Sequence, residues 1–233
     1  MKRILIANVG STSYKYTLFD ASADGSAKEL VRNGMDRVTD YEEAIKLSLD
    51  DLKSRGFDAS QIDAVAFKTV LGKNLSGLRE ADEKVVEALE AMSYVAPAHN
   101  PPYAAAIRAF GNVLPSARKV VLFETSFHQW ADEAWKHYAV PAKWEEIGVR
   151  RYGFHGASHK SAAERVAELC GRADAAEAAR TLYLRNARAD LEKPFRLINC
   201  HLGGSSSVCG ILNGASIGSS MGFTPQSGLP QNN

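Results

Sequence analysis

Hydrophobic positions in the first half of the chain follow strand-like and helix-like spacing in turn. Ile4 to Ala7 is an unbroken apolar run, as in a strand buried on both faces, and strand-type residues from Tyr14 to Phe19 follow a Gly/Ser turn. These two runs predict a β-hairpin. Further strands are predicted over Ile62 to Phe67 and Lys119 to Phe123.

Three helices are predicted among these strands. The Thr-x-x-Glu pattern at residues 39–42 is typical of a capping box, and it predicts a helix that ends at Gly56. Glu83 to Met92 has apolar residues at three- and four-residue spacing. The stretch HNPPYAAAIRAFG predicts a third helix, with Asn100 as N-cap, prolines in the first turn and Gly111 at its end.

The second half predicts helices followed by a new sheet. GASHKSAAERVAELCG predicts a helix with Ala162, Val166 and Leu169 facing inward, and the Ala/Arg-rich stretch after it is expected to be helical or partly mobile. A new sheet is expected from Leu197. The alternation indicates an α/β architecture. The Gly-rich stretch IGVRRYG places a boundary near residue 150, which predicts domains over 1–150 and 151–233.

Composition and charge exclude several partners. Among 233 residues, 45% are hydrophobic and 24% charged, the net charge is +1, and no basic run is interleaved with aromatics, so no nucleic-acid partner is expected. The first apolar run is too short for a signal peptide and no later run approaches a membrane span, which predicts a cytoplasmic protein without a membrane partner. Cys170, Cys200 and Cys209 match no zinc or disulfide spacing, and we expect reduced core thiols.

A hairpin pattern occurs twice. A gapless overlay of ILIANVGSTSYKYTLFD on INCHLGGSSSVCGILNG matches identical residues, namely Ile4, Gly10, Ser11, Ser13 and Leu18 with Ile198, Gly204, Ser205, Ser207 and Leu212. A turn of glycine and hydroxyl residues offers donors to an anion, although a single copy is more typical of a plain solvent turn without a ligand. Two copies favour two similar domains that bind the phosphates of one nucleotide. Ser11, Ser13 and Lys15 alternate along one face, so Lys15 is expected to bring a cation to the phosphates.

Six motifs occur in this order: NVGSTSYKY, VAPAHNPP, FETSFHQ, RRYGFHGASH, CHLGGSSS and SMGFTP. They resemble the acetate kinases of the actin, sugar-kinase and Hsp70 ATPase superfamily over nearly the whole chain. YGFHGASH and MGFTP are specific to that family, whereas the Gly/Ser turns fit any superfamily member. The resemblance implies duplicated ribonuclease H-like domains, the second incomplete here. It also implies an ATP-dependent phosphotransferase that moves the γ-phosphoryl group to a short-chain carboxylate, with ATP/ADP and Mg²⁺ as cofactors, an acyl phosphate as product, and a homodimer.

The resemblance also implies roles for single residues. His155 donates to the transferring phosphoryl group, with a core histidine as the alternative. His99 acts as a neutral donor, with a capping or purely structural role as the alternative. His128 and His159 are predicted to be structural. The implied catalytic residues are His155, Glu124, Lys68 and His99. The implied nucleotide contacts are Lys15, Ser11, Ser13, His201, Leu202, Gly203, Gly204 and Ser205. The implied metal ligands are Asn8 and Glu124, and the implied substrate contacts are Lys68, Val70, Ala98, Phe154 and Pro225.

The chain departs from the family pattern at several positions. Lys68 stands in place of an Arg, which keeps the charge but loses the bidentate fork. Glu124 replaces an Asp with a carboxylate one methylene longer, and Gly204 replaces an Asn. An Ala/Arg-rich insertion precedes Leu197, and the segment between residues 20 and 68 is shorter than in the family. These differences indicate a divergent branch.

The acyl pocket predicts a particular substrate size. Ala98 stands where the family has a Leu, which leaves room for extra methylenes, each worth about 0.8 kcal/mol when buried. We therefore expect a carboxylate larger than acetate, such as propionate or butyrate.

The family pattern extends past SMGFTP to a second catalytic Arg, the adenosine pocket and a later metal-binding Glu, all of which lie beyond Asn233. We expect a truncated chain; a partner chain that supplies the remainder and a longer parent protein are the alternatives. The predicted function is a carboxylate kinase that is complete only in a longer protein. The alternative is a catalytically impaired nucleotide-binding or assembly module. A sugar or glycerol kinase is a third reading, which YGFHGASH disfavours.

Overall fold

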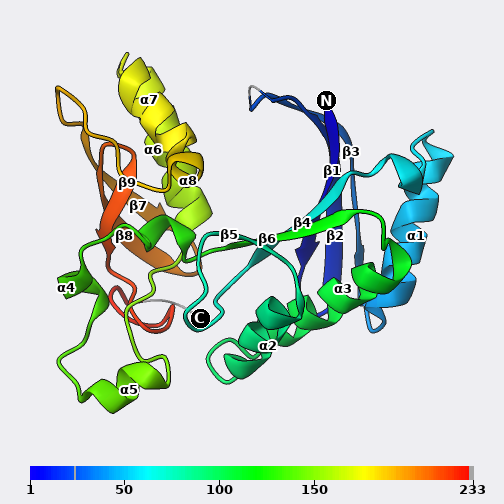
Figure 1. Cartoon of the computed structure of the whole chain (residues 1–233), viewed down its shortest axis with the longest axis horizontal. Coiled ribbons are helices and arrows are strands. Elements are labelled where there is room, and N and C mark those ends of the chain that lie inside the picture. Colours follow the sequence, from blue (N-terminus) through cyan, green and yellow to red (C-terminus); the bar gives the residue numbers. More distant parts are fainter. Residues whose placement is uncertain (24, 231–233) are drawn as a thin grey trace. The chain divides into compact units, whose positions relative to one another are not determined.

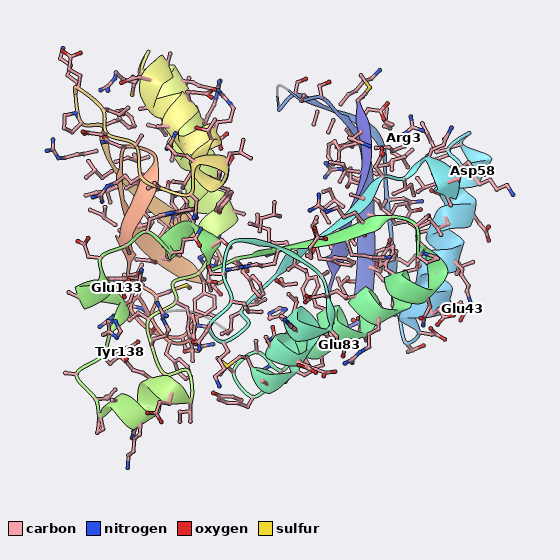
Figure 2. All side chains as sticks on the ribbon, viewed as in Figure 1. Arg3, Glu43, Asp58, Glu83, Glu133 and Tyr138 are labelled. Carbon is pink, nitrogen blue, oxygen red and sulfur yellow. The ribbon has the colours of Figure 1, made fainter. Side chains whose placement is uncertain are left out.

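The computed structural model describes residues 1–23 and 25–230. The chain forms two compact units, Met1–Phe123 and Glu124–Asn233, whose elements are labelled in Figure 1. Residues 124–150 pack in the second unit, where the Tyr138 hydroxyl, labelled in Figure 2, accepts a hydrogen bond from the Phe223 amide at 2.9 Å. The compact units therefore divide earlier than residue 150. A boundary between ribonuclease H-like repeats at that residue stays a prediction.

The first unit is an α/β fold on a mixed six-stranded sheet, with strand order β3-β2-β1-β4-β6-β5. The strands are β1 (Lys2–Val9), β2 (Ser13–Ala21), β3 (Ala27–Asp36), β4 (Ala64–Thr69), β5 (Leu78–Glu80) and β6 (Arg118–Phe123). β1, β2 and β3 form an antiparallel meander, while β4 runs parallel to both β1 and β6. The predicted hairpin and both further strands are confirmed.

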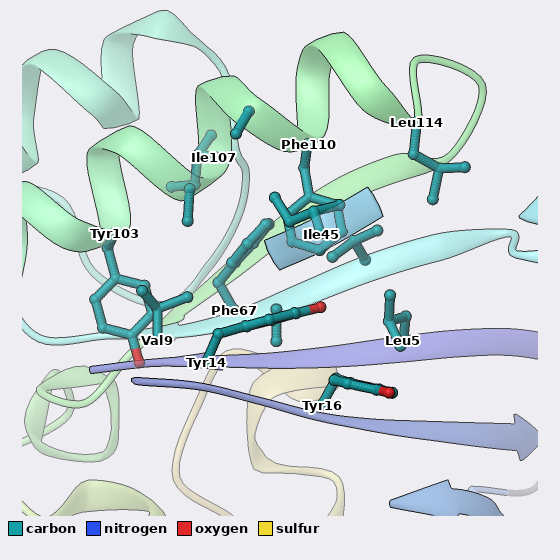
Figure 3. Packing of buried hydrophobic residues seen from close by; sticks show 14 of the residues in the cluster. Leu5, Val9, Tyr14, Tyr16, Ile45, Phe67, Tyr103, Ile107, Phe110 and Leu114 are labelled. Atoms are coloured by element: carbon teal, nitrogen blue, oxygen red, sulfur yellow. The ribbon is translucent and has the colours of Figure 1, made fainter. Parts of the chain in front are cut away.

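Helices pack on one face of this sheet, as Figure 1 shows. They are α1 (Tyr41–Ser54), α2 (Glu83–Ala91) and α3 (Asn100–Val113), with a short 3-10 helix, η1 (Ala59–Gln61). Alternate strand residues such as Leu5, Tyr14 and Phe67 meet Phe110 of α3 in the core (Figure 3). Ile4 and Ile6 point to the other face and are only partly buried. The expectation that the first strand is buried on both faces is therefore wrong.

Three helix termini differ from the sequence-based expectation. The N-cap of α1 is Asp40, not Thr39, because the Asp40 carboxylate accepts the amides of Glu42 and Glu43. α3 begins with Asn100 inside the helix, and the buried Asn100 amide donates to the Leu71 and Leu89 carbonyls instead of capping. Gly111 lies within α3, which continues to Val113.

Polar contacts join β1 to the segment that leads into β4. Arg3 donates to Asp20 at 3.0 Å and to Gln61 at 2.8 Å, and Asp58 forms a capping box with Gln61 at η1. Figure 2 labels Arg3 and Asp58 on this side of the unit. These contacts fix the start of β4 beside β1.

The second unit combines short helices with an antiparallel sheet of order β7-β8-β9. Its elements are η2 (Ser126–His128), α4 (Glu133–Lys136), α5 (Ala142–Glu146), α6 (Gly156–Leu169), α7 (Ala173–Arg180), α8 (Leu182–Arg185), β7 (Arg196–Leu202), β8 (Ser206–Leu212) and β9 (Ala215–Ser219). The Ala/Arg-rich stretch is therefore helical over α7 and α8. The new sheet begins at Arg196, next to the predicted Leu197.

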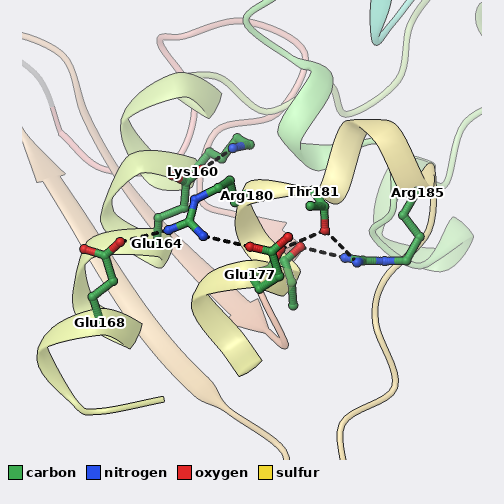
Figure 4. Close-up of polar contacts among 8 residues, drawn as sticks. Lys160, Glu164, Glu168, Glu177, Arg180, Thr181 and Arg185 are labelled. Carbon is green, nitrogen blue, oxygen red and sulfur yellow. Dashed lines mark hydrogen bonds and ion pairs between the residues drawn. The ribbon is translucent and has the colours of Figure 1, made fainter. Parts of the chain in front are cut away.

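The buried face of α6 is one position away from the predicted face. His159, Ala163 and Ala167 are buried, whereas Leu169 is 70% exposed. Alanines at these positions let α7 approach closely, and α7 presents its own buried alanines. Figure 4 shows Arg180 of α7 bound to Glu177 and to Glu168 of α6 across this contact.

The other face of the second sheet is open. Ile198 and Leu202 are each 74% exposed, and a shallow pocket of about 500 Å³ lies over β7, β8 and β9. Cys200 on the same strand is exposed, as is Cys170, and only Cys209 is buried. All three cysteines are free, but the expectation of core thiols is wrong for two of them.

The two Gly/Ser hairpins do not share one register. Ile4 pairs with Phe19 in the first, whereas Ile198 pairs with Gly210 in the second. The gapless overlay would equate Phe19 with Asn213. The overlay therefore matches the first strands of the two hairpins but not their second strands. The reason is that the turn of the β7–β8 hairpin contains fewer residues than that of the β1–β2 hairpin.

Candidate active site

The first Gly/Ser turn is tight and tied to α1. The Gly10 amide donates to the Ser13 carbonyl at 2.8 Å, and the Tyr41 hydroxyl of α1 donates to the Gly10 carbonyl at 2.6 Å. A Cβ on Gly10 would lie 2.5 Å from Ser13 Oγ, so any larger residue here would displace the Ser13 hydroxyl group. Ser11 is exposed at its tip. The geometry leaves the tip open to an anion.

Asn8 and Lys15 lie opposite each other where this hairpin ends. They are paired in the β1–β2 ladder, and both line a shallow pocket of about 460 Å³ on the sheet face away from the helices. Ser13 lies on the same face as Lys15, while Tyr14 between them points into the core. Asn8 Oδ1 accepts a hydrogen bond from the Tyr103 hydroxyl at 3.4 Å. The predicted alternation is confirmed for Ser13 and Lys15, but it is wrong for Ser11, which lies in the turn before β2.

The remaining predicted residues of the first unit follow β4 and precede α3. Lys68 is exposed near the end of β4, and Val70 just after it is 6% exposed. Ala98 and His99 are exposed before α3. His99 occupies the N-cap position but makes no side-chain cap hydrogen bond, so a capping role for its side chain is wrong, while a purely structural role stays the alternative.

In the second unit, the YGFHGASH stretch is fixed by two glycines. Gly153 has φ of 71°, and a Cβ there would lie 2.5 Å from the His128 ring. The Gly156 amide donates to the Glu124 carbonyl at 3.1 Å, and a Cβ on Gly156 would overlap that oxygen. His155, between them, adopts the left-handed conformation at the start of α6. A side chain at Gly153 would displace the His128 ring, and a side chain at Gly156 would displace the Glu124 carbonyl.

His155 lies beside His201, which comes from a later motif. Their rings stack with centroids 3.9 Å apart and an interplanar angle of 23°. His201 is on β7, and its Nδ1 lies 2.9 Å from Ser158 Oγ of α6. The structure therefore brings together two predicted residues of the second unit.

Behind this pair lie three residues to which the sequence analysis gave no role in catalysis or binding, namely Ser207, His159 and Asn199. Ser207 Oγ is 2.9 Å from His155 Nδ1 and 2.8 Å from His159 Nε2. The Asn199 amide nitrogen is 2.7 Å from His159 Nδ1. The alternation of buried positions in SSSVCGI could have predicted the role of Ser207. It places Ser207 on the buried face of the strand, where a hydroxyl group requires a hydrogen-bond partner.

Burial keeps two of these histidines uncharged near neutral pH. It lowers the pKa of His128 to about 4 and that of His159 to about 3, the latter with help from the neighbouring histidines. His128 Nδ1 contacts Ser216 Oγ at 2.8 Å, and its Nε2 contacts the Phe154 carbonyl at 2.9 Å. A structural role for both histidines stays a prediction, and it agrees with this burial.

The second Gly/Ser turn is exposed at its tip. The Gly203 amide donates to the Ser205 carbonyl at 3.1 Å, and Leu202 and Gly204 are exposed. A Cβ on Gly204 would meet no atom within 4 Å, so the Asn of the family pattern would fit here without a clash. Backbone amides in such an open turn can face an anion.

Glu124 directly follows β6 and is half-buried. Within the described part of the chain, no group of three His, Cys, Asp or Glu residues is placed to hold a metal ion. Mg²⁺ commonly takes one or two carboxylates and completes its shell with water and substrate phosphates. The single carboxylate of Glu124 therefore suits Mg²⁺, because this ion does not need all of its ligands from the protein.

The predicted acyl-pocket residues occur in both units. Phe154 is 2% exposed and Pro225 is half-buried in the second unit, while Val70 and Ala98 belong to the first. Phe154 is fixed through its carbonyl contact with His128. Their common role in substrate binding stays a prediction.

No helix in the described residues is both long and apolar enough to cross a bilayer.

Comparison with known proteins gives one consistent family. A sequence model of the Acetokinase family matches residues 3–231. Acetate kinases of Oceanobacillus iheyensis and Bacillus subtilis are 34% and 35% identical, the former over 256 residues and the latter over 253. Each alignment includes 98% of this chain, which spans 59% of the length of either relative.

Solved structures give the same result. An acetate kinase from Porphyromonas gingivalis superposes with a TM-score of 0.77 at 28% identity, and a propionate kinase from Francisella tularensis with 0.75 at 25%. Both comparisons cover 98% of this chain and 59% of the other. The fold therefore matches part of these kinases.

Proposed function

The chain belongs to the acetokinase family, and on that premise we propose that its protein transfers the γ-phosphoryl group of ATP to a short-chain carboxylate, and back. The observation that carries the proposal is the stacked pair His155 and His201, each held by a hydroxyl group from the other's motif, YGFHGASH or CHLGGSSS. Phosphoryl transfer depends on positioned donors and cations more than on covalent catalysis.

His155 is the proposed donor to the transferring phosphoryl group. It begins α6 in a left-handed conformation that Gly153 and Gly156 permit, and its ring is held between Ser207 and His201. A ring fixed in this way requires little reorganisation when charge develops on a phosphoryl oxygen. Gly203, Gly204 and Ser205 are proposed to bind nucleotide phosphates through the exposed turn, next to His201 and Leu202.

Lys15 is the proposed phosphate cation of the first unit, with Ser11 and Ser13 as hydroxyl donors from the same turn. The exposed position of Lys15, opposite Asn8, supports this role. Mg²⁺, when bound, would neutralise phosphate charge, and Glu124 and Asn8 are the proposed ligands.

Lys68 is the proposed cation for the substrate carboxylate, and His99 a proposed further donor. Both are exposed. Val70, Ala98, Phe154 and Pro225 are proposed to contact the acyl group. Because Ala98 is smaller than the Leu of the family pattern, we propose a preference for propionate or butyrate over acetate. A homodimer and a cytoplasmic location also stay predictions.

The test is formation of ADP from ATP and Mg²⁺ with acetate, propionate or butyrate, using the whole protein to which this chain belongs, with and without the substitution His155→Ala. We expect His155→Ala to reduce kcat by about 100-fold or more, because a fixed donor to the phosphoryl group is lost. The control is His137→Ala, since His137 is exposed and bound to Glu133 and Glu145, outside the site. Equal turnover by His155→Ala and the parent would contradict the role of His155.

The same assay separates the alternative function. No turnover with any of the three acids, together with ATP binding seen by calorimetry, favours a catalytically impaired nucleotide-binding module. Butyrate turnover no faster than acetate turnover contradicts the proposed substrate preference but leaves the kinase proposal intact.

A further inference from the structure

Four side chains of the second unit form a continuous hydrogen-bonded series. The Asn199 amide nitrogen lies 2.7 Å from His159 Nδ1, and His159 Nε2 lies 2.8 Å from Ser207 Oγ. Ser207 Oγ in turn lies 2.9 Å from His155 Nδ1. The series thus begins on β7, crosses to α6 and β8, and ends at the residue that begins α6.

The donor and acceptor chemistry of these groups determines which atom donates in each hydrogen bond of the series. An amide nitrogen only donates, so His159 Nδ1 accepts and carries no proton. The pKa of His159, lowered to about 3 mainly by burial, leaves the ring neutral near pH 7. The single ring proton therefore lies on Nε2 and is donated to Ser207 Oγ.

In the next hydrogen bond of the series, the Ser207 hydroxyl is the donor to His155. Ser207 is fully buried, and its hydroxyl has one hydrogen. A buried hydroxyl hydrogen requires an acceptor. Of the two ring nitrogens within 2.9 Å of Ser207 Oγ, His159 Nε2 is itself a donor, so the hydrogen is directed to His155 Nδ1. That nitrogen must then be unprotonated, which places the proton of neutral His155 on Nε2.

We propose that Asn199, His159 and Ser207 are positioning residues that hold His155 in the tautomer with its proton on Nε2. The meaning of this tautomer for catalysis rests on the proposed function, because a phosphoryl oxygen accepts hydrogen bonds and needs a donor nitrogen. The stack on His201 restricts rotation of the same ring. The series therefore sets which nitrogen donates, and the stack sets the plane in which it does so.

His128 supplies an internal reference. Its Nε2 faces the Phe154 carbonyl, which only accepts, so His128 also carries its proton on Nε2. Its Nδ1 contacts Ser216, not Ser207. A change in the series should therefore leave the His128 tautomer unaltered as long as the unit stays folded.

The test is nitrogen NMR of the ¹⁵N-histidine-labelled chain at neutral pH, without substrate. Long-range ¹H–¹⁵N correlations distinguish protonated from unprotonated ring nitrogens, and loss of one signal set in His155→Asn assigns that residue. In the parent chain we expect a protonated Nε2 and an unprotonated Nδ1 for both His155 and His159. A protonated Nδ1 on either ring, or rapid exchange between tautomers at His155, would overturn the proposal.

Two variants test the cause. Ser207→Ala removes the donor to His155, and Asn199→Ala removes the group that orients His159; in each we expect His155 to shift to an exchanging mixture of tautomers. The matched control is Ser206→Ala, because Ser206 contacts the Gly203 carbonyl and neither histidine. An unchanged His155 tautomer in a folded Ser207→Ala chain would overturn the proposal. If the Ser207→Ala chain does not fold, as judged by the His128 signals, the Asn199→Ala chain serves as the test, because Asn199 is only half-buried. An unchanged His155 tautomer in folded Asn199→Ala would then overturn the proposal.

The outcome is separable from that of the proposed function. The expected tautomer in the chain, together with no turnover of any carboxylate by the whole protein to which it belongs, contradicts the kinase proposal alone. A chain that turns over a carboxylate with His155 protonated on Nδ1 contradicts the positioning proposal alone.

Discussion

At the residue scale, single atoms decide which side chains the site tolerates. Gly153 lies against the His128 ring, and Gly156 lies against the Glu124 carbonyl. The two glycines therefore tie the conformation of His155 to a buried histidine and to the backbone of the proposed metal ligand. A sequence motif shows that glycines are present, and the contacts show what each one permits.

Lys68 allows a direct test of substrate recognition at this scale. Replacing Lys68 by Arg restores a bidentate donor, so we expect kcat/KM for acetate to rise by up to about 10-fold, the worth of one charged hydrogen bond. The control is Lys84→Arg, an exposed lysine of α2. The measurement is the rate of ADP formation against acetate concentration. No gain over the control would argue against Lys68 as the carboxylate cation.

At the scale of the element, helix ends were the least predictable feature. The pattern Thr-x-x-Glu correctly indicated a helix start, but Asp40 is the neighbouring residue with a carboxylate that reaches two amides. Which of two adjacent polar residues caps a helix depends on backbone angles, and Asp40 has the extended conformation of an N-cap.

Asp40→Ala should destabilise the chain, whereas Thr39→Ala should not. Loss of the two hydrogen bonds at 2.8 and 3.1 Å removes the cap of α1, and we expect about 1 kcal/mol less stability in urea unfolding. Thr39 is exposed and makes no cap contact, so Thr39→Ala should stay within about 0.5 kcal/mol of the parent. The reverse order of the two variants would show that the cap is assigned wrongly.

Gly111→Ala should stabilise the chain. Gly111 lies inside α3, and an added Cβ there meets no atom within 4 Å. Alanine in a helix interior is worth about 0.5 to 1 kcal/mol relative to glycine. Gly214→Ala is the contrasting variant, because Gly214 has φ of 78° and its Cβ would lie 2.5 Å from the Ala179 amide nitrogen. Thermal unfolding should rank Gly111→Ala above the parent and Gly214→Ala below it.

At the scale of the whole molecule, each unit has a core of its own. Leu5, Phe67 and Phe110 belong to the core of the first unit, and Phe127 and Ile211 to that of the second. The buried histidines are confined to the second unit, so a response of stability to pH that depends on them should arise there.

Stability should fall as the pH drops from about 6.5 toward 4. The pKa values of His128 and His159 are about 4 and 3 in the folded chain, below the ordinary histidine value near 6.5. The unfolded chain therefore binds protons in this range that the folded chain does not, which favours unfolding. His137 opposes this trend, because Glu145 and Glu133 raise its pKa. Urea midpoints measured at pH 7.5, 6 and 5 test the sign, and an unchanged midpoint would contradict burial of neutral histidines.

The sequence by itself determined the local structure and the family. Hydrophobic spacing located the hairpin, the helices of the first unit and the later sheet, because that spacing repeats within a few residues. The motifs from NVGSTSYKY to SMGFTP indicated the family, which the comparison confirmed over residues 3–231.

Only the tertiary structure decided how distant residues meet. The register of the second hairpin, the buried face of α6 and the series Asn199, His159, Ser207 and His155 depend on packing between segments far apart in the chain. Ser207 in sequence is one serine among three. It becomes a specific hydrogen-bond donor because strand alternation buries it and α6 brings two histidines within 2.9 Å of its oxygen, where an unpaired hydroxyl would be costly.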